Sequence, residues 1–380
     1  MDNISINIIL LIEIIVLILF LFLFTKFTLI VIIILILFYI YLYFSKNPTT
    51  KIDPNTKFQS IEYYPSFTNT YHLINKKMFK IGKNDILIKT FYASINPVDY
   101  KLNYNIIPFY RYFVYLGVGY DIVGQVIEIG NNVKNFKIGD YIYGKSESGS
   151  LSEYSICSEK YIVNINNISN NSQKLIQIAG LPLVGVTALQ CLQYFNKIEN
   201  KDILIIGASG GVGHIAIQLC KYLKANKIYG VCSSKNFSLI QKYTENLIDY
   251  GSDLQSQFNQ QKFDLIFDTV SSFEDGDKQK VYNKYLNENG CYIKINSDNI
   301  LEFFKGILNS NCHINFERKN NHVHLLKWNL KDLTLLYNIF NEGHLTVSTD
   351  IYQFNLENIK EGYNKLKSRR TKGKIIYEFQ

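Results

Sequence analysis

A glycine-rich loop is the part of this sequence whose residue types and spacing most directly indicate chemistry. It follows the apolar stretch of residues 203–206 and precedes a helix-like stretch at residues 211–223. Glycines at such a place let the backbone approach a pyrophosphate, and the helix that follows directs free N–H groups and the positive end of its dipole at the anion. A purely structural turn is the alternative, but strand, loop, helix and second strand occur in the order that dinucleotide binding requires. The loop residues expected to bind the cofactor are Gly207, Ser209, Gly210, Gly211, Val212 and Gly213.

The end of the next apolar strand, residues 227–232, predicts which nicotinamide cofactor is bound. A site for NAD places Asp or Glu there for the ribose hydroxyls. This chain has Ser233, Lys235 and Asn236 instead, and hydroxyl and ammonium groups suit a 2′-phosphate. The sequence therefore predicts NADPH, with a solvated turn lysine as the alternative interpretation of Lys235.

Two patterns describe the elements that position these residues. From residue 85 to residue 144, short β-rich stretches alternate with glycine turns, which predicts a compact, barrel-like β domain. Further along, strands alternate with helices, which predicts a parallel doubly wound sheet and places the chain in the α/β class. These later strands are expected at residues 202–206, 227–232, 263–267 and 291–295.

Several motifs in one order make the chain, from about residue 85 onward, similar to the medium-chain dehydrogenase/reductases. The resemblance is to the zinc-free quinone oxidoreductase branch, and within it to the chloroplast envelope members. It rests on residues 94–101, residues 179–190, the glycine loop with His214 and Gln218, and residues 372–376. It implies a GroES-like catalytic domain that is split in sequence around a Rossmann NADP-binding domain. The expected boundaries are residues 50–181 and 317–380 for the catalytic domain and residues 182–316 for the Rossmann domain.

The resemblance also implies chemistry without a catalytic metal. In zinc-dependent relatives a Cys stands at the position of Asn96 and a His at that of Tyr120, and a further lobe with four cysteines binds a structural zinc. Without a Lewis acid, alcohol oxidation has no means of stabilising an alkoxide. Hydride addition to an activated C=C bond needs only a donor to the developing enolate. We therefore expect no metal site, and NADPH-dependent reduction of quinones or α,β-unsaturated carbonyls.

Further cofactor contacts follow from the resemblance alone. It places Thr187 against the nicotinamide, Tyr250 and Lys235 near the adenosine phosphate, and Lys374 at the cofactor.

Two residues are candidates for the catalytic step. The resemblance places Asn96 beside the substrate, and Asn96 is also the expected N-cap of a helix that starts at Pro97. Lys101 lies one turn after Pro97 on the same face, so it could donate to the enolate or supply a proton. A solvated lysine on a first helical turn is the alternative.

The N-terminal segment predicts a membrane anchor at residues 1–45. Residues 6–44 are almost entirely apolar and would form one helix of roughly 58 Å, whereas a span needs about 20 residues, so either one pass or a two-helix hairpin fits. A cleavable signal peptide is the alternative, but no basic stretch precedes the run and no small-residue cleavage site follows it. Lysines beyond the run predict that the globular body faces the cytosol.

Composition limits the kinds of partner that the chain is expected to bind. The net charge of +8 is spread over the chain, which argues against a nucleic-acid partner, and the six cysteines show no paired spacing, which predicts free thiols in a reducing compartment. The expected partners are a small-molecule quinone or enone and a lipid bilayer; a homodimer is left open. The alternative function is an NADPH-binding, membrane-associated regulatory or trafficking protein of the same fold without turnover.

Overall fold

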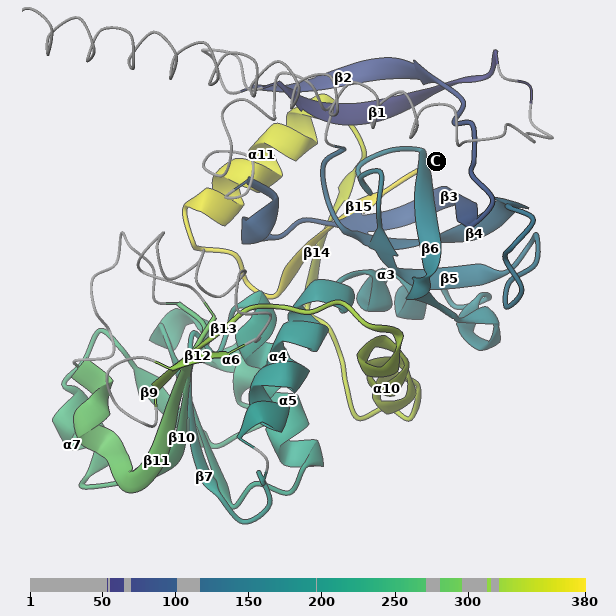
Figure 1. Ribbon diagram of the computed structural model, residues 1–380. Coiled ribbons are helices and arrows are strands. Elements are labelled where there is room, and N and C mark those ends of the chain that lie inside the picture. Colours follow the sequence, from purple (N-terminus) through teal and green to yellow (C-terminus); the bar gives the residue numbers. More distant parts are fainter. Residues whose placement is uncertain are drawn as a thin grey trace, which may run out of the picture.

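The computed structural model describes most of the chain beyond the N-terminal segment (Figure 1). The predicted anchor and Lys101 lie outside the described residues. The described residues are 53, 55–64, 70–100, 117–195, 197–270, 281–295, 313–315 and 321–380.

A β barrel forms the first lobe. Strand β3 hydrogen-bonds to both β4 and β6, and β5 joins β4 to β6, so the four antiparallel strands close on themselves. Their inward residues are fully buried, as expected of alternating strands that cover a core. The barrel-like β domain predicted from the sequence is confirmed. The strands are β3 (Asp85–Ser94), β4 (Asp121–Ile129), β5 (Tyr141–Ser146) and β6 (Tyr154–Asn164).

The C-terminal segment returns to this lobe. Strand β15 adds antiparallel to β3, and β14 adds parallel to β15, which extends the barrel sheet to six strands. Helix α11 lies beside the hairpin of β1 and β2, with Tyr363 stacked on Tyr71 at 4.4 Å between ring centroids. These elements are β1 (Lys57–Tyr64), β2 (Thr70–Lys77), α10 (Leu330–Asn341), β14 (Thr349–Gln353), α11 (Leu356–Lys367) and β15 (Lys374–Glu378).

A seven-stranded sheet forms the second lobe, in the order β12-β13-β11-β10-β7-β8-β9. Every pairing in it is parallel except that of β12 with β13, so the predicted doubly wound sheet is confirmed. The strands are β7 (Asp202–Ile206), β8 (Lys227–Cys232), β9 (Asn246–Asp249), β10 (Phe263–Asp268), β11 (Leu286–Lys294), β12 (His313–Asn315) and β13 (Asn321–His324). The helices that follow or precede them are α3 (Ser172–Ala179), α4 (Pro182–Tyr194), α5 (Gly211–Tyr222), α6 (Phe237–Ile240) and α7 (Leu254–Phe258), with short 3₁₀ turns η2 (Asn166–Ile168), η3 (Ser234–Asn236) and η4 (Asn283–Tyr285).

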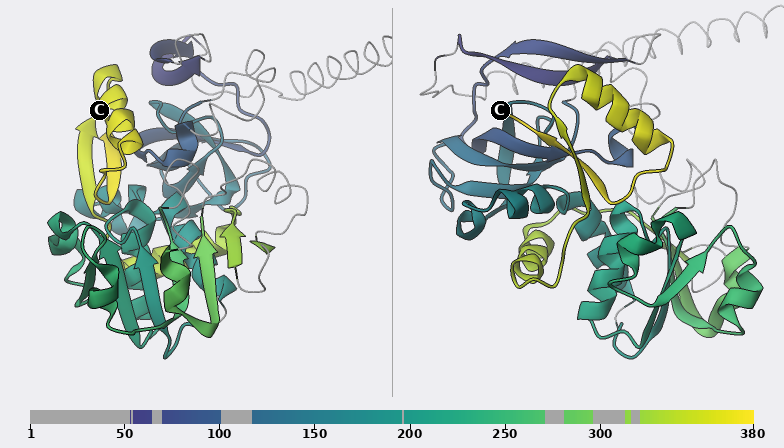
Figure 2. Two further views of the ribbon diagram at one scale, coloured as in Figure 1. Left: turned by 90° about the vertical axis from the view of Figure 1, so that its left-hand side faces the viewer. Right: turned by 180° about the vertical axis from the view of Figure 1, so that it is seen from behind.

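The strand order reverses at β7. The chain runs from β7 outward through β8 to β9, then returns to the other side of β7 as β10. Such a switch point opens a crevice outside the carboxyl ends of the strands, where ligands of open α/β sheets bind. The barrel lobe lies over this end of the sheet (Figure 2), so both lobes contribute residues there.

The two lobes share one hydrophobic core. Buried residues of the barrel, such as Val123 and Tyr143, belong to the same cluster as Ala188 of α4 and Ile215 of α5. The predicted domain boundaries stay predictions, although β13 pairs with β11 and therefore carries the Rossmann sheet as far as residue 324.

Within the described part of the chain, no single helix is both long enough and apolar enough to cross a membrane. One bent pair, α3 with α4, passes that test by length and composition when the two are taken together, with 59° between them.

Candidate functional site

The glycine loop lies at the switch point, between the end of β7 and the start of α5. Gly207 has φ +81°, and a Cβ there would lie 2.4 Å from atoms of Thr269 and Val270 on the loop after β10. A Cβ on Gly213 would lie 2.2 Å from the carbonyl oxygen of Gly207, so the helix packs directly on the loop. Gly210 is the N-cap and has no side-chain cap, which leaves the first turn of α5 open to an anion. This geometry fits a pyrophosphate.

The segment before β15 closes one side of this loop. The Gly373 N–H donates to the Ser209 carbonyl at 3.0 Å, and Gly373 pairs with Gly210 as an isolated parallel bridge. The aliphatic stem of Lys374 crosses the start of α5, because a Cβ on Gly211 would lie 3.2 Å from Lys374 Cδ. The aliphatic stem of Lys374, which is a predicted cofactor residue, thus lies against the loop.

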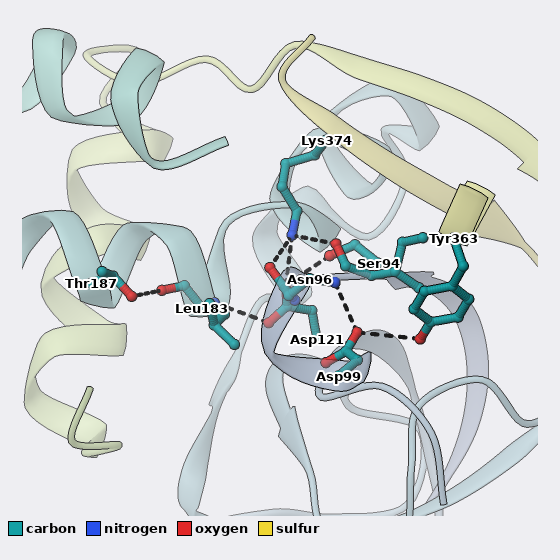
Figure 3. Close-up of polar contacts among 9 residues, drawn as sticks. Ser94, Asn96, Asp99, Asp121, Leu183, Thr187, Tyr363 and Lys374 are labelled. Atoms are coloured by element: carbon teal, nitrogen blue, oxygen red, sulfur yellow. Dashed lines mark hydrogen bonds and ion pairs between the residues drawn. The ribbon is translucent and has the colours of Figure 1, made fainter. Parts of the chain in front are cut away.

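The ammonium of Lys374 points instead into a buried polar cluster of the barrel lobe (Figure 3). It donates to the Ile95 carbonyl at 3.0 Å, to Asn96 Oδ1, and to Asp121 Oδ2 at 3.2 Å. Three acceptors match the three N–H donors of an ammonium. Burial lowers the pKa of Lys374, and the carboxylates of Asp121 and Asp99 oppose that shift.

Asp121 is the anion that makes this burial possible. Its side chain is 0% exposed and accepts four hydrogen bonds or ion-pair contacts. Oδ2 accepts from Ser94 Oγ at 2.7 Å, Asn96 Nδ2 at 2.8 Å and Lys374, and Oδ1 accepts from the Leu183 N–H at 2.9 Å. The Lys374 cluster, defined as Ser94, Asn96, Asp121 and Lys374, therefore joins β3, β4 and β15 to the start of α4.

Asn96 is inside this cluster and directly precedes the helix that starts at Pro97. The Asp99 carboxylate accepts from the Asn96 backbone N–H at 2.8 Å, and the Asn96 carbonyl accepts from the Asp99 N–H at 3.0 Å. Asp99 thus supplies one half of a capping box, and the helix starts at Pro97 as predicted. The Asn96 amide is bonded to Lys374 through its oxygen and to Asp121 through its nitrogen, so its orientation is fixed. Its catalytic role stays a prediction.

Asp99 is a residue that the sequence analysis missed. Desolvation raises its pKa to about 8, with a further upward contribution from Asp121 and downward ones from the Asn96 backbone, Lys374 and Tyr363. At neutral pH this carboxyl is mostly protonated. The signal for it was present, since Asn96 and Asp99 have the spacing of a capping box, but spacing does not reveal burial.

Thr187 is brought to the same region by α4. Its hydroxyl donates to the Leu183 carbonyl at 2.8 Å, and Leu183 is the residue whose N–H contacts Asp121. His214, on α5, is neutral: burial lowers its pKa to about 4, Nδ1 donates to the Gly210 carbonyl at 2.8 Å, and Nε2 accepts from the Ser348 N–H at 3.3 Å. It connects the glycine loop to the residue directly before β14.

The predicted adenosine residues lie together at the ends of β8 and β9. Lys235 is exposed in the turn η3, and Tyr250 is 63% exposed directly after β9. Asn236 Nδ2 donates to Ser209 Oγ at 3.2 Å, which ties this turn to the glycine loop. The structure therefore brings Ser233, Lys235, Asn236 and Tyr250 to the same edge as the loop, while their contacts with a cofactor stay predictions.

A metal site is not formed by the described side chains. Within the described part of the chain, no three His, Cys, Asp or Glu residues are grouped so that they could bind an ion. Asn96 is committed to Lys374 and Asp121, and Tyr120 lies next to Asp121 with its pKa raised by burial and by Asp99.

The fold and this edge define an α/β oxidoreductase with a nicotinamide cofactor. Residues 82–167 match the alcohol dehydrogenase GroES-like domain, and residues 244–376 match the family described as zinc-binding dehydrogenase. The chain is 30% identical over 313 residues to quinone-oxidoreductase QR1 of Triphysaria versicolor, covering 78% of this chain and 90% of that protein. The chain belongs to the medium-chain dehydrogenase/reductase family, in its quinone oxidoreductase branch, as the sequence predicted.

Two further similarities agree with this assignment. The chloroplast envelope quinone oxidoreductase homolog of Arabidopsis thaliana is 31% identical over 230 residues, covering 56% of this chain and 66% of that protein. The quinone oxidoreductase of Coxiella burnetii shares the fold, with a TM-score of 0.72 at 24% identity over 86% of this chain and 100% of that one.

Proposed function

We propose that this oxidoreductase uses NADPH, without zinc, to reduce quinones or the C=C bond of α,β-unsaturated carbonyls. One observation carries the proposal: the buried ammonium of Lys374 lies on Asp121 and on Asn96, the position at which zinc-dependent relatives have a Cys ligand, and its stem lies on the glycine loop. The cation of this site is thus supplied by the chain itself, directly beside the cofactor edge.

The chemistry expected there is a polar reduction. Bound NADPH supplies a hydride. When a hydride adds to the β-carbon of an enone, the C=C electron pair forms a double bond from the α-carbon to the carbonyl carbon, the C=O π pair moves onto the oxygen, and the resulting enolate needs one proton to complete the product. In a quinone the same addition, with one proton, gives the hydroquinone.

The chain's own residues prepare the site for this step. The Lys374–Asp121 ion pair provides a fixed electrostatic environment without net charge, and Asp99 is mostly protonated beside it. Asp121 also accepts from the Leu183 N–H, which fixes the start of the helix that carries Thr187. Asp99 accepts from the Asn96 N–H and so fixes the start of the helix at Pro97. Lys101, the proposed proton donor, lies outside the described residues.

The names of two relatives support the substrate class. Besides QR1, an NADPH-dependent alkenal/one oxidoreductase of Arabidopsis thaliana is 31% identical over 202 residues, covering 50% of this chain and 51% of that protein. That relative's name specifies NADPH, which agrees with the hydroxyl and lysine residues after β8.

We further propose that the body acts at a membrane surface and faces the cytosol. The support is the apolar run at residues 6–44 with lysines after it. Alkaline extraction of membranes, followed by protease protection of intact vesicles, tests this. Release of the chain by alkaline carbonate, or protection of the body inside the vesicle, would contradict the proposal.

The activity is tested with the purified full chain in detergent. Oxidation of NADPH is followed against a panel of quinones, alkenals and enones, with NADH in parallel. Turnover of at least one compound class is expected. Tight NADPH binding with no turnover across the panel would instead support a binding protein without catalysis.

A further inference from the structure

Asp249 is an acidic residue at the cofactor edge, although the turn directly after β8, residues 233–236, contains no acid. Cys232, the last residue of β8, is the register partner of Asp249, the last residue of β9. Neighbouring strands lie about 4.8 Å apart, so the two strand ends are side by side. The carboxylate at this edge therefore comes from the end of β9 rather than from the end of β8.

This carboxylate is fixed in place from two sides. The backbone of Asp249 is bound by the Gln257 side chain, which accepts from its N–H at 2.8 Å and donates to its carbonyl at 3.0 Å. The carboxylate accepts from the Gly251 N–H at 3.0 Å, and Ser234, in the turn after β8, lies close enough for its hydroxyl and backbone N–H to help lower the pKa of this carboxyl. These contacts, that of Gly251 first, lower the pKa of Asp249, so it carries a negative charge at neutral pH.

Ser234 connects this charge to the turn expected to bind the 2′-phosphate. It lies between Ser233 and Lys235 in the turn η3, and it influences the pKa of the Asp249 carboxyl through its hydroxyl and backbone N–H. Lys235 is exposed on the same turn and provides the opposite charge.

We propose that Asp249 is a specificity-determining residue that opposes Lys235 in the choice between NADPH and NADH. This inference rests on the proposed function, because it assigns the cofactor preference of that same site. A carboxylate repels a 2′-phosphate and favours a ribose 2′-hydroxyl, whereas the lysine does the reverse. The chain consequently accepts both cofactors, with a preference for NADPH smaller than Lys235 alone would give.

The test measures binding at the adenosine end only, so that catalysis is not needed. The full chain in detergent is titrated by calorimetry with 2′,5′-ADP and with 5′-AMP. Asp249→Asn should raise the ratio of the affinities for 2′,5′-ADP and 5′-AMP by about three- to fivefold, the scale of one exposed charge contact. Lys235→Ala should lower the same ratio, and both effects should shrink as salt is added.

Asp253→Asn is the matched control. Asp253 is an exposed acid four residues after the half-buried Asp249, and its carboxylate caps α7 by accepting from the Gln255 and Ser256 N–H groups. Asp253→Asn removes the same charge, keeps a side-chain oxygen that can cap the helix and leaves Ser234 untouched, so the ratio should not change. An equal change in the ratio for Asp253→Asn would show a general charge effect and overturn the inference.

Two other outcomes separate this inference from the proposed function. If the wild type binds 2′,5′-ADP but Asp249→Asn changes both affinities by the same factor, Asp249 is structural and only the inference is overturned. If the wild type binds neither fragment, the proposed function is overturned and the inference with it.

Discussion

The glycine loop and the Lys374 cluster lie against each other, yet they are built in opposite ways. The loop is one continuous run from Gly207 to Gly213, and its backbone conformation gives it the geometry that fits a pyrophosphate. The cluster draws on the end of β3, the start of β4 and the start of β15, with Asp121 and Lys374 separated by 253 positions. A local motif can be recognised along the chain, whereas a cluster of this kind exists only once the strands have paired.

The largest effect should come from removing the anion of the cluster. Asp121→Ala leaves the Lys374 ammonium buried at 3% exposure without its charge partner, and breaking such a pair costs about 3–5 kcal/mol. Urea unfolding of the full chain in detergent measures the loss. Adding Lys374→Met to Asp121→Ala should restore part of the stability, because the unpaired charge is then gone.

Asp350→Ala is the matched control for that prediction. It breaks the Lys365–Asp350 ion pair at 2.8 Å, whose side chains are 34% and 39% exposed. An exposed pair is worth about 0–1 kcal/mol, so the free energy of unfolding should change little. Similar losses for Asp121→Ala and Asp350→Ala would mean that burial of the Lys374 cluster does not matter.

The sequence predicted the loop better than the cluster for a physical reason. The strand, glycines and helix at residues 202–222 depend on local geometry, so their bounds were predicted closely. Asn96 and Lys374 were identified only as separate candidates, because nothing along the chain shows that their side chains meet. Asp99, Asp121 and Asp249 were not selected as site residues, since burial and neighbouring strands decide what those carboxylates contact.

Two alanine substitutions within the glycine loop should separate folding from cofactor binding. Gly213→Ala places a Cβ 2.2 Å from the Gly207 carbonyl oxygen, and such overpacking costs about 1–3 kcal/mol. Gly210→Ala meets no atom closer than 3.3 Å and has an extended backbone, so the fold should tolerate it. Both should weaken NADPH binding, since both narrow the anion site. Calorimetric titration and urea unfolding together test this, and equal stability of the two variants would contradict the packing argument.

A pH-dependent effect is expected from the protonation of Asp99. Its folded-state pKa of about 8 lies above the value of 3.8 for an unperturbed carboxyl, so the folded chain retains a proton that the unfolded chain has released. Stability from this group therefore falls as the pH rises from about 4 to about 8. Asp99→Asn keeps the oxygen that accepts from the Asn96 N–H and cannot titrate.

The measurement is urea unfolding of wild type and Asp99→Asn between pH 5 and pH 8. The wild type should lose stability relative to the variant as the pH rises, by on the order of 1 kcal/mol per pH unit at most. Among the described residues, the charged and titratable groups around Asp99 are Asp121, Lys374, Tyr120 and Tyr363, and they are the same in both proteins. Parallel pH curves would show that Asp99 does not take up a proton on folding.

The smallest expected effect is that of a chelator on quinone or enone reduction. In the structure, Asn96 Oδ1 and Asp121 Oδ2 both accept from the Lys374 ammonium, so a divalent cation at that place would meet a like charge and an amide in place of a thiolate. Activity of the purified full chain should therefore be unchanged after exhaustive chelation, with elemental analysis of the same sample as the second readout. Stoichiometric zinc, with activity that is lost on chelation and restored by zinc, would mean that the ammonium is displaced in the working enzyme. In that case the Lys374 cluster would be a resting arrangement, and alcohol oxidation would again be a candidate reaction.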